Sequence, residues 1–368
     1  MKLLLAFITF VLATGLATAS PVYNQINLVS DIPGLAAVTD PNLKNPWGMS
    51  FTATSPFWVS DAGTNKATLY NGAGTPNSLV VSIPAAGPTG QVGNGTTGFT
   101  LTPGDPARFI FAALDGSISG WNPAVNATNA VVKVQASVNN TFTGLALGTA
   151  GAASFLYAAN FKSGHIDVYD SNFAPTTLVG NFTDPTLPSG YAPFNVESVG
   201  GFLYVEYAKV AANGDKDPGP GNGFVSVFDT NGNFIRRLIS KGALNAPWGI
   251  TIAPSLFGDF SNDLLVGNFG DCRINAFDPI TGALVGTLLD SNSIPIAIDG
   301  LWALKVRSGG VGVDPNRVYF TAGINGEANG LFGALAVPGQ AAVPEPGTLL
   351  LIAIATFGMI AVRGKCAH

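Results

Sequence analysis

The sequence predicts an all-β protein built from six similar sheets, and three observations support this fold class. Short apolar runs alternate with turns rich in Asn, Asp, Gly and Pro, and the 368 residues include 46 Gly and 25 Pro. No segment between the two ends of the chain shows helical periodicity. The apolar runs also recur in the same order six times, which indicates an internal repeat.

Each repeat begins with two apolar runs separated by a turn. We expect the first runs to form strands at 47–52, 98–103, 143–148, 195–200, 248–253 and 301–306. The second runs lead from bulky residues into a small or polar end, and we expect them at 57–61, 109–113, 155–160, 202–206, 264–268 and 318–322. Two such runs in succession are typical of a β-hairpin.

A third run ends each repeat's apolar pattern with an aromatic residue and a turn, and a fourth run completes five of the six repeats. The fourth runs lie at 79–84, 130–135, 176–182, 234–240 and 283–289. The sixth repeat lacks one, whereas the run 25–30 precedes the first repeat without a partner. Pairing this N-terminal run with the last repeat closes a circle and covers the free strand edges. The sequence therefore predicts a six-bladed β-propeller over residues 24–338, closed by an N-terminal strand.

The composition excludes several classes of function. Charged residues make up 11% of the chain, against about a quarter in an ordinary soluble domain. The net charge of −5 and the lack of a basic run argue against binding to nucleic acid. Two His and two Cys leave little material for a zinc site or a disulfide framework.

The N-terminal segment predicts export. Lys2 is followed by an apolar run at 3–12, and then by the small residues Ala17 and Ala19. This order of charge, short apolar segment and small residues is that of a secretory signal peptide, which we place at 1–19.

The C-terminal segment predicts a membrane-directed tail. Residues 348–362 carry no charge, and Arg363 and Lys365 follow directly. We expect a linker at 339–346, then a hydrophobic transmembrane sorting helix with a basic tail at 347–368. By the positive-inside rule the basic end stays cytoplasmic, so this helix would anchor the exported chain transiently in the inner membrane.

The motif before this helix carries a resemblance. Val343, Pro344, Glu345 and Pro346, an apolar helix and Arg363 together resemble a PEP-CTERM sorting signal. The resemblance implies processing by an exosortase-type enzyme and release into the cell envelope or the extracellular matrix. The family usually ends in a denser Arg cluster than this chain has. A GPI-anchor signal and a plain tail anchor are the alternative interpretations.

A second resemblance covers the repeats. Asn-Pro-Trp-Gly at 45–48 is matched by Ala-Pro-Trp-Gly at 246–249, and Ser-Asp-Ala-Gly stands at 60–63. With these motifs the chain resembles NHL-type six-bladed propellers, and especially an uncharacterised family of exported bacterial proteins that often bear PEP-CTERM tails. This resemblance implies the fold and export but no activity.

Polar residues that end the second runs, or follow them, are the candidate ligand-binding residues. In a propeller such residues converge on one funnel; here they are Asp61, Asp115, Asn160, Glu206, Asn268 and Asp271. Carboxylate and amide oxygens suit calcium, and Asp61, Asn160, Glu206 and Asn268 would be its ligands if a metal is bound. The opposing interpretation is that these are turn residues, since Asn and Asp favour turns for conformational reasons.

Two functional hypotheses follow. The first is a non-catalytic binding or scaffold protein without a cofactor, whose partner is an extracellular polysaccharide or an envelope protein. The alternative is a calcium-dependent hydrolase or lactonase that acts in the central funnel. No nucleophile motif accompanies the candidate residues, which favours the first hypothesis.

Overall fold

The computed structural model describes residues 22–339. The predicted signal peptide at 1–19, the linker beyond Gly339 and the sorting helix at 347–368 lie outside these residues. Within residues 22–339, no helix has the length and apolarity needed to cross a membrane.

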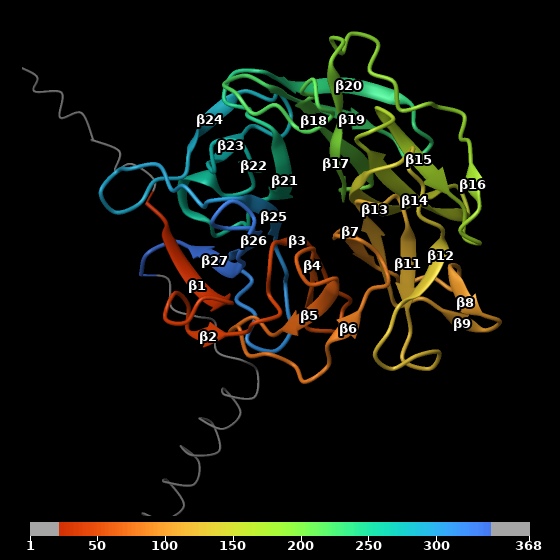
Figure 1. The fold of residues 1–368 in the computed structure, drawn as a ribbon. Coiled ribbons are helices and arrows are strands. Elements are labelled where there is room, and N and C mark those ends of the chain that lie inside the picture. The colour runs from red at the N-terminus through yellow and green to blue at the C-terminus, as the bar shows by residue number, and fades with distance from the viewer. Residues whose placement is uncertain (1–21, 340–368) are drawn as a thin grey trace, which may run out of the picture.

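Six sheets surround a central axis, which confirms the six-bladed β-propeller (Figure 1). From the axis outward, blade 1 contains β3 (Pro46–Ser50), β4 (Phe57–Asp61), β5 (Lys66–Tyr70) and β6 (Val81–Ser82). Blade 2 contains β7 (Pro88–Gly93), β10 (Phe109–Ala113), β11 (Ile118–Trp121) and β12 (Val131–Val134). Blade 3 contains β13 (Phe142–Ala150), β14 (Ala153–Asn160), β15 (His165–Tyr169) and β16 (Pro175–Thr176).

The second half of the chain repeats this arrangement. Blade 4 contains β17 (Tyr191–Val199), β18 (Phe202–Lys209), β19 (Gly223–Phe228) and β20 (Phe234–Ser240). Blade 5 contains β21 (Pro247–Ile252), β22 (Leu264–Asn268), β23 (Ile274–Phe277) and β24 (Leu284–Thr287). Blade 6 contains β25 (Leu301–Lys305), β26 (Val318–Ala322), β27 (Leu331–Ala336), β1 (Asn24–Ser30) and β2 (Val38–Thr39). A short 3-10 helix, η1 (Gly258–Phe260), lies between β21 and β22.

The ring closes as the sequence predicts. Strand β1 pairs antiparallel with β27, from Asn24 opposite Ala336 to Ser30 opposite Leu331. In Figure 1 the first strand of the chain lies beside the last one. The blade that ends the chain thus takes its fourth strand from the N-terminus, and β2 extends the same sheet by a parallel pairing.

One predicted inner strand is wrong, and two predicted outer strands are longer than those observed. The inner strand of blade 2 is β7 (Pro88–Gly93), whereas 98–103 contributes β8 (Thr100–Thr102) to a separate two-stranded hairpin with β9 (Asp105–Pro106). Phe99 has a φ of 58°, a left-handed conformation that an extended inner strand does not allow. The predicted runs at 79–84 and 176–182 form strands only at Val81–Ser82 and at Pro175–Thr176.

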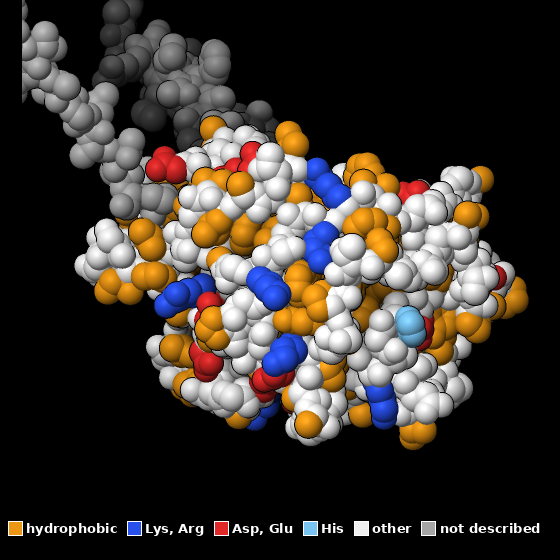
Figure 2. All heavy atoms as spheres, turned by 90° about the horizontal axis from the view of Figure 1, so that it is seen from above, with side chains coloured by type: hydrophobic (Ala, Val, Ile, Leu, Met, Phe, Trp, Pro, Cys, Tyr) orange, Lys and Arg blue, Asp and Glu red, His pale blue; other side chains and the backbone are white. Residues whose placement is uncertain are grey.

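Aromatic side chains fill the space between adjacent blades. Trp58 of blade 1 stacks on Phe109 of blade 2 with ring centroids 4.1 Å apart, and Phe57 packs on Tyr319 of blade 6 at 4.6 Å. Aromatic side chains bury a large area for each residue, so the blades can pack against one another with few charged contacts between them. Figure 2 accordingly shows only scattered charged side chains on the side of the molecule that it views.

Glycines set the width of the ring. A Cβ added to Gly48 would lie 2.4 Å from the carbonyl oxygen of Thr89, and one added to Gly90 would lie 2.2 Å from the backbone nitrogen of Leu145. Similar clashes would occur on the inner strands of blades 3 and 5, at Gly144 and Gly249. The inner strands therefore approach their neighbours too closely for any side chain at these positions.

The duplicated tryptophan motifs adopt one conformation. Asn45 and Ala246, which precede the two prolines, both have a φ of 45°. Their carbonyl oxygens accept equivalent hydrogen bonds, from the backbone nitrogens of Ala62 at 3.1 Å and of Phe269 at 3.0 Å. The same turn thus places Trp47 and Trp248 at the start of β3 and β21.

The substitution Gly90→Ala tests this packing. The new methyl group would meet backbone atoms that cannot move without separating two blades, so we expect a loss of about 1–3 kcal/mol in the free energy of unfolding. Urea denaturation of the full chain measures it. Gly95→Ala is the matched control, because nothing lies within 4 Å of its added Cβ, and a change within about 0.5 kcal/mol is expected. Equal effects of the two substitutions would contradict the packing argument.

Candidate functional site

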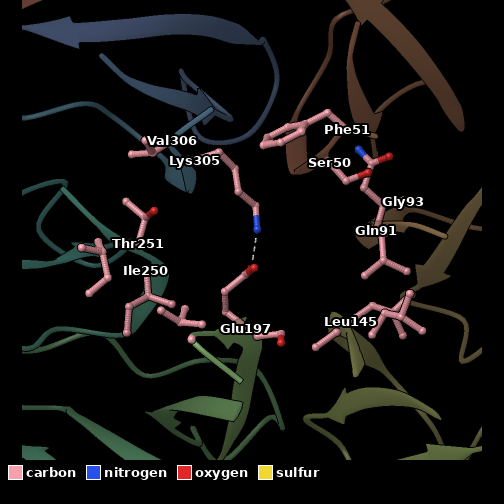
Figure 3. Close-up of a pocket in the computed structure, with 17 residues that line it drawn as sticks. Ser50, Phe51, Gln91, Gly93, Leu145, Glu197, Ile250, Thr251, Lys305 and Val306 are labelled. Atoms are coloured by element: carbon pink, nitrogen blue, oxygen red, sulfur yellow. Dashed lines mark ion pairs between the residues drawn. The ribbon is translucent and has the colours of Figure 1, made fainter. Parts of the chain in front are cut away.

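The main cavity opens at one end of the central channel. It has a volume of about 450 Å³ and is lined by residues from the inner strands of all six blades. The lining residues include the final residues of these strands, such as Ser50 of β3, Gly93 of β7, Val199 of β17 and Lys305 of β25. Figure 3 shows these side chains arranged around the open space.

An ion pair crosses this cavity. Lys305 of blade 6 and Glu197 of blade 4 point toward each other, and Nζ lies 2.5 Å from Oε2 (Figure 3). Both side chains are only partly exposed, at 20% and 24%. The two charges cancel, so the wall of the cavity is polar but electrically balanced.

Two buried polar side chains on the opposite wall have unused hydrogen-bonding capacity. The Nε2 group of Gln91 donates to the carbonyl oxygens of Gly48 and Trp58, both at 2.7 Å, which fixes its amide between blades 1 and 2. Its Oε1 atom has no hydrogen-bond partner among residues 22–339, and neither has the Oγ atom of Ser50. Both residues line the cavity.

The other end of the channel is closed by aromatic side chains. Trp47 and Trp302 stack with ring centroids 3.5 Å apart, and Trp248 packs edge-on against both. The Nε1 group of Trp248 donates to the carbonyl oxygen of Thr143 at 2.9 Å, which ties blade 5 to blade 3. All three tryptophans are less than 5% exposed, so they are not available to stack on a sugar.

A polar network covers this aromatic plug. The Oδ1 atom of Asn45 accepts a hydrogen bond from Trp302 Nε1 at 3.1 Å, and Asn45 Nδ2 donates to Glu327 Oε2 at 3.0 Å. Glu327 also pairs with Lys216 at 3.1 Å. The ammonium group of Lys216 lies 4.4 Å from the ring centroid of Phe269, so a cation–π contact adds to the ion pair.

The six residues predicted from the sequence all lie toward the plugged end. Asp61, Asn160 and Asn268 end their strands opposite the first residues of β3, β13 and β21, and Glu206 pairs with Asn195 of β17. Asp115 and Asp271 lie in the turns that follow β10 and β22. The large cavity is at the opposite end, because its lining residues stand at the far ends of the inner strands.

Two of the predicted residues form hydrogen bonds with the loops that connect neighbouring blades. The Oδ1 atom of Asn160 accepts from the backbone nitrogens of Thr141 and Ser163, at 3.1 and 3.2 Å. In the same way Asn268 Oδ1 accepts from the nitrogen of Asn245 at 3.1 Å. These amides satisfy backbone groups in the loops that lead into inner strands, as expected for polar residues at turns.

The turn residues Asp115 and Asp271 have local partners as well. Asp115 accepts from the backbone nitrogens of Ala86 and Ser117, at 2.9 and 3.0 Å. Asp271 Oδ1 accepts from Asn268 Nδ2 at 3.0 Å.

Asp61 and Glu206 are different, because both are fully buried. No other described residue forms a hydrogen bond with the carboxyl oxygens of Glu206, and at Asp61 the nearby Thr68 only partly offsets the effect of burial. Burial raises the pKa of each carboxyl well above its usual range. The nearby Glu197 raises the pKa of Glu206 further, whereas Lys305 opposes this shift. The part of the chain at 22–339 has no cluster of three or more His, Cys, Asp or Glu side chains that could hold a metal ion.

Two of the cavity residues could have been recognised in the sequence, because they are charged residues within predicted first runs. Glu197 and Lys305 are the charged residues of the two inner strands β17 and β25. A charge is rarely buried in such a strand unless it is paired, so the two positions could have been expected to meet at the axis. Gln91 could not be found in this way, because its strand was not predicted.

Comparison with known proteins agrees with the fold and the tail. Residues 342–365 match the PEP-CTERM protein-sorting motif. Uncharacterized protein R648 of Acanthamoeba polyphaga mimivirus is 34% identical over 333 residues, which cover 84% of this chain and 78% of that protein. Uncharacterized protein L690 of the same virus is 34% identical over 333 residues, with 84% of each chain covered. The chain belongs to the family of these two proteins.

Solved structures resemble this chain in fold alone. A streptogramin B lyase superposes with a TM-score of 0.51 at 11% identity, over 86% of this chain and 97% of the lyase. A protein of unknown function from Bacteroides thetaiotaomicron gives a TM-score of 0.54 at 10% identity, over 85% and 76% of the two chains. The sorting motif and the propeller fold are therefore shown for this family member.

The substitution Glu206→Gln tests the buried carboxyl. The pKa of Glu206 is higher in the folded state than in the unfolded chain. Between these two pKa values the folded state therefore holds more protons than the unfolded chain does, and the free energy of unfolding falls as the pH rises. We expect the substitution to remove this fall, which can reach about 1.4 kcal/mol per pH unit between the two pKa values. Unfolding by urea from pH 4 to pH 9 measures it.

Asp259→Asn, which alters an exposed carboxyl, is the control for Glu206→Gln and should leave the pH profile nearly unchanged. Calcium provides a second readout, because a tightly bound ion raises the melting temperature. If calcium raised the melting temperature of the parent protein and Glu206→Gln abolished this rise, the Glu206 carboxyl would be an ionised ligand. This result would contradict a raised pKa of Glu206.

Proposed function

We propose that this protein is an exported, non-catalytic binding or scaffold propeller. A signal peptide at 1–19 directs it across the membrane, and an exosortase-type enzyme cuts it at the Pro-Glu-Pro motif. It then remains in the cell envelope or the extracellular matrix and binds its partner at the open end of the channel.

The observation that carries this proposal is the position of the sorting motif relative to the closed ring. The last strand, β27, ends at Ala336 and is already paired with β1, whereas the motif matches from residue 342. Cutting at Pro344–Pro346 would therefore remove no strand of the propeller. A fold that is complete before the cleavage site is suited to release as an intact domain.

The open channel supports binding rather than catalysis. Its two ionisable groups, Lys305 and Glu197, neutralise each other, so neither is poised as a free acid or base. The similarity to a streptogramin B lyase extends to the fold alone and supplies no reason to assign its chemistry to this chain.

Processing can be tested in a bacterium that contains an exosortase. We expect the full chain to lose its C-terminal segment there and to keep it when the exosortase gene is deleted, because the cut depends on that enzyme. Replacement of Pro344, Glu345 and Pro346 by Ala should leave most of the protein at precursor length in the membrane fraction. Immunoblotting and intact-mass measurement of the envelope fractions distinguish the two forms.

Pro338→Ala, which changes a proline just outside the sorting motif, is the control and should be processed like the parent chain. The same chain length in the exosortase-containing and the deleted strain would reject the proposed processing.

A further inference from the structure

The open cavity presents a particular set of hydrogen-bonding groups. The Lys305 ammonium has three donors, of which the ion pair with Glu197 occupies one, and the Glu197 carboxylate can accept further bonds. Gln91 Oε1 and Ser50 Oγ are buried behind this lining, in side chains that are 4% and 7% exposed, so a ligand in the cavity reaches the ion pair rather than these two atoms.

Apolar side chains separate these polar groups. Phe51, Leu145 and Ile250 come from blades 1, 3 and 5 and line the same cavity (Figure 3). The volume of about 450 Å³ lies within the range of about 300–1,000 Å³ that is typical of small-molecule sites. The cavity therefore suits a small ligand with an apolar body and several polar groups at its edge.

The charge balance favours a neutral ligand. Lys305 and Glu197 already neutralise each other at 2.5 Å, so an anion or a cation would have to compete with a formed ion pair. A neutral ligand can bond to both members of the pair without separating them.

A hydroxyl group suits this ion pair best, because one oxygen atom can accept from Lys305 and donate to Glu197. A peptide divides these roles between separate N–H and C=O groups. We propose that the open end of the channel binds a neutral polyhydroxylated ligand, the terminal part of a carbohydrate chain. This inference rests on the proposed binding function and specifies its ligand class.

Titration of the full chain with neutral sugars tests the inference. The chain is purified in a detergent without a sugar head group and titrated with glucose, galactose, mannose, N-acetylglucosamine and their short oligomers. Saturable binding of at least one of them, with a Kd of about 1 mM or tighter, is expected. Because the ligand is uncharged, the affinity should change little between low and high salt.

Ser50→Ala and Ser119→Ala are the control variants. Each removes a buried hydroxyl without a partner among the described residues, so the melting temperature should stay the same or rise. Neither hydroxyl is open to the cavity, and Ser119 lies on the third strand of blade 2, outside the cavity lining, so both variants should leave the sugar affinity unchanged.

Lys305→Met tests the ion pair, and a loss of about tenfold or more in sugar affinity is expected, because hydrogen bonds to a charged group are stronger. Several results would overturn the inference: no saturable binding of any sugar, equal affinities in the parent chain and in Lys305→Met, or preferential binding of glycine or of a short peptide tested in parallel.

Failure of this inference can be told apart from failure of the proposed export and processing. Tail cleavage is followed by mass in the envelope fraction, without any ligand. A processed protein that binds no sugar rejects only the carbohydrate site, whereas sugar binding by a chain that is never cut rejects only the processing.

Discussion

The close approach of the inner strands around the axis is the constraint on which the rest of the structure depends. A Cβ at Gly48 or Gly90 would fall within 2.4 Å of a backbone atom of the next blade. Glycine at these positions of the inner strands lets neighbouring blades approach each other. The residue directly before each glycine then lies next to the axis. In blades 1 and 5 that residue is a tryptophan, whereas in blades 2 and 3 it is Thr89 or Thr143. Large rings from one side of the ring therefore fill a channel whose other side is lined by small residues.

This asymmetry gives the two ends of the channel different properties. At the starts of the inner strands, the stacked tryptophans and the network of Asn45, Glu327 and Lys216 exclude solvent and tie the blades together. At the ends of the same strands Phe51 is the aromatic residue of the lining, no tryptophan lines the cavity, and the cavity contains the Lys305–Glu197 pair. The structure thus separates a closed, stabilising end from an open end, where we propose that the ligand binds.

The sequence predicts the fold well because every blade repeats the same apolar order, and because the run at 25–30 has no partner except the last blade. It fails at blade 2 for a physical reason. The inner strand Pro88–Gly93 reads Pro-Thr-Gly-Gln-Val-Gly, which lacks the apolar character of a strand, yet its Thr89-Gly90 step corresponds to Trp47-Gly48. The candidate site is predicted at the plugged end because periodicity locates strand ends but not which end is filled. That choice depends on how Trp47, Trp248 and Trp302 pack in three dimensions.

The buried carboxyl of Glu206 lies outside the cavity lining but acts electrostatically on the open end. It pairs in register with Asn195, two residues before Glu197, and both Glu197 and Lys305 act on its charge. One lysine cannot neutralise two carboxylates. Burial raises the pKa of Glu206 well above its usual range, and this favours the neutral carboxyl beside the ion pair of Lys305 with Glu197. The charge balance of the cavity is therefore coupled to a group outside its lining, because an ionised Glu206 would add a second carboxylate that acts on Lys305.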